Sequence, residues 1–270
     1  MAINDITLAG GMRNNLVSLQ MVSAMQARTT ERLATGKRVN SAVDDPSAYF
    51  AAQNHRNRAN DLAARKDQMG EAIQTVKAAL QGIEGITKLI EQAKGLAASA
   101  RSANAADRSS LSDQFDALRT QIDEMAADGS YKGTNFLASD SLTVDFNEDG
   151  SSSLTVSGFD ASTTGLAIGA STNSWIADSD IDAAVTDLDD ALSTLRANAK
   201  TLASNNGVVT ARQEFTTQLI NTLTTGADVL TAADTNEEGA NMLALQTRQQ
   251  LGIVALQLSS QAQQSVMRLF

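Results

Sequence analysis

Few residues of this chain have the type and spacing that catalysis or metal binding requires. His55 is the only histidine among 270 residues, and there is no cysteine. Zinc sites are built mainly from histidine and cysteine, so a two-histidine zinc site or an HExxH helix cannot be assembled within one chain. A place on a helix surface is therefore favoured for His55 over a role as a pH switch.

Two groups of acidic residues have a spacing that could bind a metal ion. The run Asp145–Gly150 begins like a calcium loop, but the twelfth position is Val156 instead of the bidentate glutamate. Asp178, Asp180 and Asp182 are spaced like ligands, yet they also suit the positive end of a helix dipole. We expect a hairpin turn and a helix start, respectively, and predict no metal-binding residue.

Asp44 and Asp45 are adjacent carboxylates that could serve in acid–base chemistry. No histidine or cofactor motif accompanies them, and Pro46 follows directly. Asp before Pro is typical of a helix start, because Asp caps the helix and the missing N–H of Pro costs nothing there. We expect capping, together with pairing to Lys37 or Arg38, and predict no catalytic residue and no cofactor.

Charge is distributed unevenly along the chain, whose net charge is −10. Between Lys132 and Arg196 there are eleven acidic residues and no basic one, so the rest of the chain is nearly neutral. Near-neutral segments can pack closely, whereas an acidic segment stays in water. The lack of a basic stripe disfavours binding to nucleic acid. We expect neither a conventional cleaved signal peptide nor insertion into a membrane, since no sufficiently long apolar run occurs.

Apolar residues with 4,3 spacing predict long helices that pack as coiled coils in both halves of the chain. The series are Leu62, Met69, Ile73, Val76, Leu80, Ile83, Ile90; Leu111, Phe115, Leu118, Ile122, Met125; and Ile181, Val185, Leu188, Leu192, Leu195, Leu202. Between them, period-two alternation in residues 141–146 and 153–157 predicts a β-hairpin. The fold class is mainly α: an elongated antiparallel helical coiled coil or bundle from both chain ends, with a small β-hairpin region in the middle.

Helix boundaries follow from capping and helix-breaking residues. We expect helices at 3–33, from Pro46 to about 100, after a loop at 101–107 up to Asp128, and from Ser179 onward, with an interruption or a bend at 205–207. Thr235 and Glu238 form a capping-box signal before a last helix at 237–270. That helix carries two apolar seams and few charges, so it requires partners inside the fold or from other copies.

Three motifs in the order of a known family resemble bacterial flagellins. Residues 33–45, Leu-Ala-Thr-Gly-Lys-Arg-Val-Asn-Ser-Ala-Val-Asp-Asp, match the family pattern that follows the first helix. Residues 241–252 and the closing Gln264–Phe270 look like the flagellin C-terminal helix, and residues 132–137, Lys-Gly-Thr-Asn-Phe-Leu, resemble the family's turn after its short core helix. The resemblance covers about residues 1–137 and 181–270 and leaves the middle out.

The resemblance implies a subunit that self-polymerises into the flagellar filament for swimming motility and is not an enzyme. It implies export in an unfolded state through the flagellar secretion channel. The expected partners are other copies of the chain, the export apparatus with a flagellin chaperone, and the filament cap and hook-junction proteins. In domain terms it implies an inner core of residues 1–40 and 235–270, a helical shell of 41–137 and 178–234, and a small β or irregular insert at 138–177. The filament lies outside the cell, so secretion is expected.

Under this resemblance the important residues are those at interfaces. The polymer interface is expected at Leu16, Leu19, Leu251, Val254, Leu256, Leu258 and Phe270, and the joint between inner and outer helices at Arg38, Asn40, Asp44 and Asp45. The family segment recognised by an innate-immune Toll-like receptor aligns near residues 91–97, which include Gln92, Lys94, Gly95 and Leu96. Gln92 and Gly95 stand where recognised members carry Arg and Glu, which predicts weak or absent activation.

Two alternatives remain open from the sequence. A hook–filament junction protein has similar terminal helices and would occur in far fewer copies per cell than a filament subunit. A helical scaffold that does not polymerise would have helical ends in the dilute monomer. An enzyme is disfavoured because no convergent catalytic set can be assembled.

Overall fold

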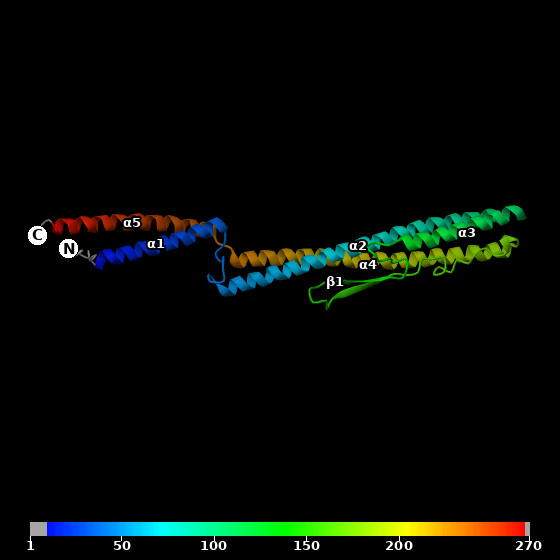
Figure 1. Ribbon diagram of the computed structural model, residues 1–270, viewed down its shortest axis with the longest axis horizontal. Helices are drawn as coiled ribbons and strands as arrows, with labels where there is room; N and C mark the ends of the chain where they lie inside the picture. The colour runs from blue at the N-terminus through cyan, green and yellow to red at the C-terminus, as the bar shows by residue number, and fades with distance from the viewer. Residues whose placement is uncertain (1–9, 268–270) are drawn as a thin grey trace, which may run out of the picture. The chain divides into compact units, whose positions relative to one another are not determined.

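A computed structural model describes residues 10–267 and is mainly α-helical with one small β-hairpin, as the sequence predicts (Figure 1). Its elements are α1 (Gly10–Thr35), α2 (Pro46–Arg101), α3 (Ala105–Asp128), β1 (Ser141–Asp145), β2 (Ser153–Ser157), the short 3-10 helix η1 (Asn173–Trp175), α4 (Asp178–Thr231) and α5 (Thr235–Met267). They form two compact units: unit 1 is Met1–Arg56 with Leu223–Phe270, and unit 2 is Asn57–Thr222. Among the described residues, no helix is both long enough and apolar enough to cross a membrane.

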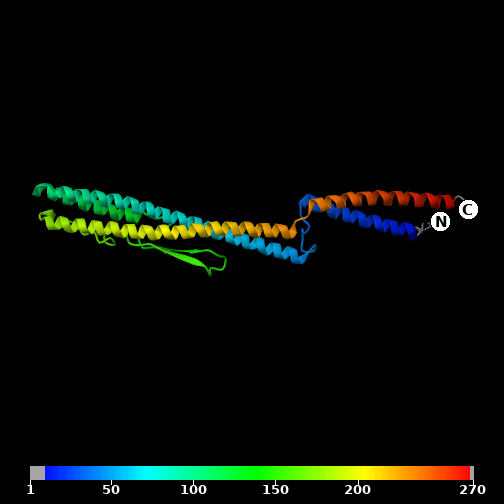
Figure 2. The same ribbon diagram turned by 180° about the vertical axis from the view of Figure 1, so that it is seen from behind.

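Unit 2 is built on the antiparallel pair of α2 and α4, which lie side by side in both views (Figures 1 and 2). The predicted seams lie in its core: Met69 and Ile90 of α2, with Leu188 and Leu195 of α4, are fully buried. Ile86 of α2, which the predicted series did not include, is fully buried as well. Ion pairs on the rim show the register. Lys94 binds Asp189 at 2.5 Å and, one heptad further along α2, Arg101 binds Asp182, one heptad back along α4. This opposite stepping is the signature of antiparallel packing.

The β-hairpin is the predicted one, with Leu142 opposite Val156 and Val144 opposite Leu154. Val144 and Val156 are buried on one face of the hairpin. The paired Thr143 and Thr155 are exposed on the other face, as in a sheet that packs on one side only. Arg58 of α2 pairs with Glu148 in the turn at 2.5 Å. The segment between the two strands is a hairpin turn, as expected. Within it, the Asp149 carboxylate accepts the Ser151 N–H at 3.0 Å.

Two carboxylates one heptad apart on α3 fasten the segment that follows the hairpin. Asp123 accepts the backbone N–H and the hydroxyl of Thr163 at 2.7 and 3.0 Å. Asp116 accepts the same two groups of Ser171 at 3.0 and 2.6 Å. Charged acceptors make these bonds stronger than neutral ones. They hold this irregular segment against α3.

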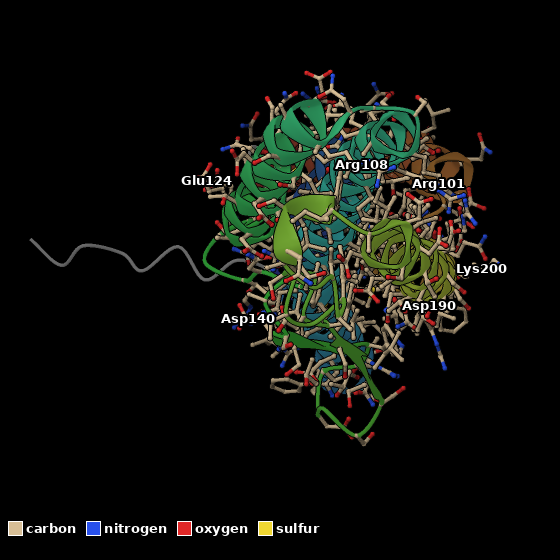
Figure 3. The ribbon with its side chains drawn as sticks, turned by 90° about the vertical axis from the view of Figure 1, so that its right-hand side faces the viewer. Arg101, Arg108, Glu124, Asp140, Asp190 and Lys200 are labelled. Carbon is tan, nitrogen blue, oxygen red and sulfur yellow. The ribbon has the colours of Figure 1, made fainter. Side chains whose placement is uncertain are left out.

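The end of unit 2 is a left-handed turn around the single tryptophan. Asn173, Ser174 and Trp175 all have positive φ, at 47°, 49° and 55°. The Trp175 side chain is fully buried and its ring lies 5.0 Å from that of Phe115. Arg108 donates to the carbonyls of Trp175 and Ile176 and to the carboxylate of Asp178. Figure 3 looks onto this end and labels Arg108.

Three boundary predictions are wrong. The helix α4 continues through 205–207, because Leu202 and Val209, on either side of this stretch, remain buried in the core seam. α3 begins at Ala105, because Asn104 caps it by accepting the N–H groups of Ala106 and Asp107. The cap of α5 is Asp234, whose carboxylate accepts the N–H groups of Asn236 and Glu237, so Thr235 and Glu238 do not form a capping box.

Candidate self-assembly surface

The helices α1 and α5 of unit 1 pack on each other along one seam (Figure 1). The less exposed positions follow a heptad spacing on both helices: Asn15, Leu19, Val22, Gln26, Thr29, Leu33 on α1 and Glu238, Met242, Leu245, Gln249, Gly252, Leu256 on α5. Only Val22, Thr29, Glu238 and Leu245 of these are buried. A seam with so few buried apolar side chains gives a marginal helix pair.

Leu19 of α1 packs directly against the backbone of α5 at Gly252. A Cβ atom placed there would meet Leu19 Cδ2 at 2.7 Å and Cγ at 3.0 Å. Leu19 therefore occupies the space that any other residue at position 252 would need. Leu19, which was predicted at the polymer interface, thus makes a contact within the chain.

One partly buried ion pair joins the two helices at their other end. Arg32 binds Glu238 at 2.7 Å, and their side chains are 26% and 9% exposed. A carboxylate buried to this extent is stable only with a charged partner. The pair fixes which turn of α1 meets the first turn of α5.

The outward faces of α1 and α5 are rich in exposed apolar side chains. They are Leu16, Val17, Met21 and Met25 on α1, and Leu243, Leu251, Ile253, Val254 and Leu258 on α5. We call these nine residues the outer apolar face. Unit 1 contains eight basic and eight acidic residues, so it has no net charge and unit 2 carries the whole −10. A neutral apolar face of this kind is a typical association surface.

The predicted polymer-interface residues divide into two groups. Leu16, Leu251, Val254 and Leu258 lie on the outer apolar face, with Leu258 67% exposed. Leu19 and Leu256 are half-buried on the seam between α1 and α5. Phe270 lies outside the described residues.

Sequence reasoning missed several residues of the outer apolar face. Val17, Met21 and Met25 recur every four residues, which is the spacing of one helical ridge. That spacing is the sequence signal that could have identified them. Leu16 and Leu256 also line a groove of about 710 Å³ between the two helices.

The joint between α1 and the following helix is held by the backbone. The N–H groups of Arg38 and Val39 both donate to the carbonyl of Thr231, at 2.8 and 3.2 Å, and Ala233 N–H donates to the carbonyl of Gly36 at 2.9 Å. Gly36 has a φ of 68°, where residues with a side chain are strained. The turn after α1 is thereby fastened to the turn between α4 and α5.

The four predicted joint residues do come together, mostly through local bonds. The Asp44 carboxylate accepts the backbone N–H groups of Asn40 and Ser41 at 3.2 and 3.0 Å and the Ser41 hydroxyl at 3.0 Å. The backbone bond from Ser41 is the main reason why the pKa of Asp44 lies below its ordinary value. Asp45 accepts the N–H of Ala48 at 3.0 Å, so it caps α2 as expected, and it lies 3.9 Å from Arg38.

The predicted receptor-like segment lines one wall of a groove between α2 and α3. Gln92, Gly95, Leu96 and Ser99 of α2 face Ala117 and Leu118 of α3 across a cavity of about 610 Å³. We call this the α2–α3 groove; none of its lining residues is charged. Lys94 does not line it, because its ammonium binds Asp189 of α4.

The chemistry of the remaining candidate residues is limited. Within residues 10–267 no three histidine, cysteine or acidic side chains gather as a metal site would require. His55 is half-buried, with its ring about 4.0 Å from where a Cβ of Gly226 would lie.

Comparison with known proteins agrees with this reading. Residues 3–141 match the family model of the bacterial flagellin N-terminal helical region. Over all of both chains, the sequence is 30% identical to flagellin FljM and 29% identical to flagellin FljK of Caulobacter vibrioides. It is 25% identical to a flagellin of Brucella melitensis over 90% of each chain. A crystal structure of Bacillus cereus flagellin aligns with 55% of this chain and 88% of its own at a TM-score of 0.49 and 18% identity.

A mainly helical chain that exposes large apolar side chains along a helix pair is typical of a structural protein that assembles with copies of itself. The chain belongs to the bacterial flagellin family. It is a structural subunit of the flagellar filament, and neither the junction protein nor a scaffold that does not polymerise is favoured.

Proposed function

We propose that the outer apolar face of α1 and α5 is the surface through which copies of this chain pack in the core of the filament. The observation that carries this proposal is that nine large apolar side chains lie exposed on a unit with no net charge. Burying one such side chain contributes about 1.5–3 kcal/mol, and no charge repulsion opposes it.

The remaining parts of the chain surround that core. Residues 41–137 and 178–234 form the helical shell, and residues 138–177 form a small outer insert. The acidic composition of unit 2 supports this arrangement, because the net charge of −10 would then lie where water can solvate it. Arg38, Asn40, Asp44 and Asp45 hold the joint between the two layers.

Family membership supports the route to the filament. The chain is secreted and functions outside the cell, after export in an unfolded state through the flagellar channel with help from a flagellin chaperone. It contacts the cap at the growing end and the hook-junction proteins at the base. Its role is structural and it catalyses no reaction.

The test replaces one exposed leucine by a charge. Leu258→Asp is expected to abolish filament formation, because each copy would bury an unpaired carboxylate. The folded part of the monomer and its export are expected to remain, since Leu258 is 67% exposed in the single chain. Thr164→Asp adds the same charge to the exposed insert and is the matched control. Filament length by electron microscopy and secreted protein by immunoblot are the measurements; normal filaments from Leu258→Asp would disprove the proposal.

The receptor-like segment supports a second part of the proposal. Gln92 and Gly95 are exposed and uncharged, so they offer no ionic contact to a receptor that reads Arg and Glu at these places. We expect weak or absent Toll-like receptor activation by the monomer. A reporter-cell assay in which the monomer gives full-strength signalling would contradict this.

A further inference from the structure

Methionine is the only sulfur-containing residue of this chain, which holds eight methionines and no cysteine. Two of them, Met21 and Met25, belong to the outer apolar face and are 57% and 50% exposed. They lie four residues apart on α1, so their side chains are neighbours on one ridge of the helix. The thioether sulfur of an exposed methionine is open to oxidants in the surrounding water.

The other methionines with described side chains are better covered. Met69 is fully buried in the core of unit 2. Met125 is half-buried, with its sulfur against α2, where a Cβ atom of Gly85 would lie 2.5 Å from it. Met12 and Met242 are half-buried where α1 and α5 pack on each other. Among the methionine side chains that the structure describes, an oxidant in water therefore reaches the two on the outer apolar face first.

Oxidation of methionine by hydrogen peroxide transfers one oxygen atom to the sulfur. A sulfur lone pair attacks one peroxide oxygen, an S–O bond forms and the O–O bond breaks. The sulfur loses two electrons, and the peroxide gains them. The second peroxide oxygen takes up the proton of the first and leaves as water. The product, methionine sulfoxide, has a polar oxygen that accepts hydrogen bonds, so a flexible apolar side chain becomes a polar one.

The two positions differ in the donors that α1 itself could offer to a sulfoxide. The helix neighbours of Met21, three and four residues away, are Val17, Ser18, Ala24 and Met25, none of which is charged. Met25 has the exposed Arg28 three residues further on, and a guanidinium donates strong hydrogen bonds. The nine side chains of the outer apolar face supply no N–H or O–H donor. A sulfoxide at position 21 is therefore the harder one to bury.

We propose that Met21 and Met25 are a modification site at which peroxides stop the chain from assembling, with Met21 the more sensitive position. The oxidised copy keeps its fold, because both side chains lie on the surface. It cannot be packed against another copy without burying a sulfoxide oxygen that lacks a donor. In a finished filament the same face is covered, so assembled copies are protected. This inference rests on the proposed function, because it assumes that the outer apolar face is buried between copies.

The experiment treats the full-length monomer with hydrogen peroxide and measures its critical concentration for assembly. Mass spectrometry of peptides gives the oxidised fraction of each methionine. Met21 and Met25 are expected to react first, and oxidation is expected to raise the critical concentration at least about tenfold. The double variant Met21→Leu with Met25→Leu is expected to assemble normally before and after treatment, because leucine has a similar volume and forms no sulfoxide. The matched control, Met12→Leu with Met242→Leu, is expected to be inactivated like the unmodified chain.

Two results would overturn this inference and leave the proposed function standing. One is that the Met21→Leu, Met25→Leu chain is inactivated as readily as the unmodified chain. The other is that monomers oxidised at both positions assemble normally. The proposed function is tested separately by treating finished filaments: if Met21 and Met25 react there as fast as in the monomer, the outer apolar face is not covered, and the proposed function is wrong.

A second measurement covers the case in which the leucine variant assembles poorly before any treatment. Met21→Gln places a polar side chain on the same ridge without an oxidant. It is expected to raise the critical concentration at least about tenfold, and Met25→Gln to raise it less, because Arg28 can pair with the new polar group. Assembly of Met21→Gln at the concentration of the unmodified chain, or a larger effect of Met25→Gln, would refute the inference.

Discussion

Replacing Arg108 by methionine tests how the end of unit 2 is held together. The Arg108 guanidinium is 14% exposed and donates to the carbonyls of Arg101, Ala103, Trp175 and Ile176 and to the carboxylate of Asp178. Methionine keeps most of the apolar stem and removes all of these donors. Several carbonyls would then lose a charged donor at the same time.

The expected change in the free energy of unfolding follows from two opposing contributions, backbone strain in the turn and burial of Trp175. Three consecutive residues with positive φ cost about 1 kcal/mol or more each, so the turn stores roughly 3 kcal/mol of strain. Burial of Trp175 contributes a similar amount, about 3 kcal/mol. The bonds from Arg108, at about 1.5–3 kcal/mol for the strongest of them, therefore decide whether the turn stays closed. We expect Arg108→Met to lower the free energy of unfolding by about 3 kcal/mol, mainly by opening this turn.

The single tryptophan reports directly on the turn. In Arg108→Met, Trp175 fluorescence is expected to shift to longer wavelength and to become accessible to acrylamide, while helical circular dichroism is retained. Arg101→Met is the control, because Arg101 is exposed at the same end and pairs only with Asp182 on the rim. If Trp175 stays protected in Arg108→Met, the turn is held by burial alone and the reasoning is wrong.

Three further predictions concern local contacts. Because hydrogen bonds hold the pKa of Asp44 below its ordinary value, its contribution to stability is present above about pH 4 and is lost as pH falls below that. Asp44→Asn should accordingly destabilise the joint turn at neutral pH, and the difference from the unmodified chain should shrink as pH falls below about 4, measured by amide hydrogen exchange. Gly252→Val should force Leu19 out of its position and separate α1 from α5. We expect the free energy of unfolding of unit 1 to fall by about 1–3 kcal/mol. An unchanged melting curve would contradict this. Asp123→Ala should release the segment at Thr163 and cost about 1–3 kcal/mol, seen as faster proteolysis within the insert, whereas undiminished protease resistance would show that the bond matters little.

The features that were predicted correctly depend on residues that lie close together in the chain. Heptad spacing located the seams of α2 and α4, Asp45 with Pro46 located a helix start, and alternation located the β-hairpin, because each of these signals is contained within a few residues. The prediction of an interruption at 205–207 was wrong for a physical reason. Helix-breaking propensity amounts to about 1 kcal/mol per residue, and packing of the flanking seam outweighs it.

The candidate surface was only partly predictable. The sequence shows that α5 carries two apolar seams, but it does not reveal which of them turns toward α1. That choice depends on the fit of Leu19 against Gly252 and on the pair of Arg32 with Glu238, which are more than 200 residues apart. For this reason Leu256 and Leu258, two residues apart in the chain, have different surroundings.

The sequence alone therefore determined the mainly helical fold, the neutral ends with an acidic middle, and the family, since composition and periodic spacing are properties of the chain itself. Tertiary structure alone decided the left-handed turn held by Arg108, the uncharged groove between α2 and α3, and which apolar side chains of α1 and α5 stay exposed on the outer apolar face. These features are set by side chains far apart in sequence, and only folding brings them to the same place.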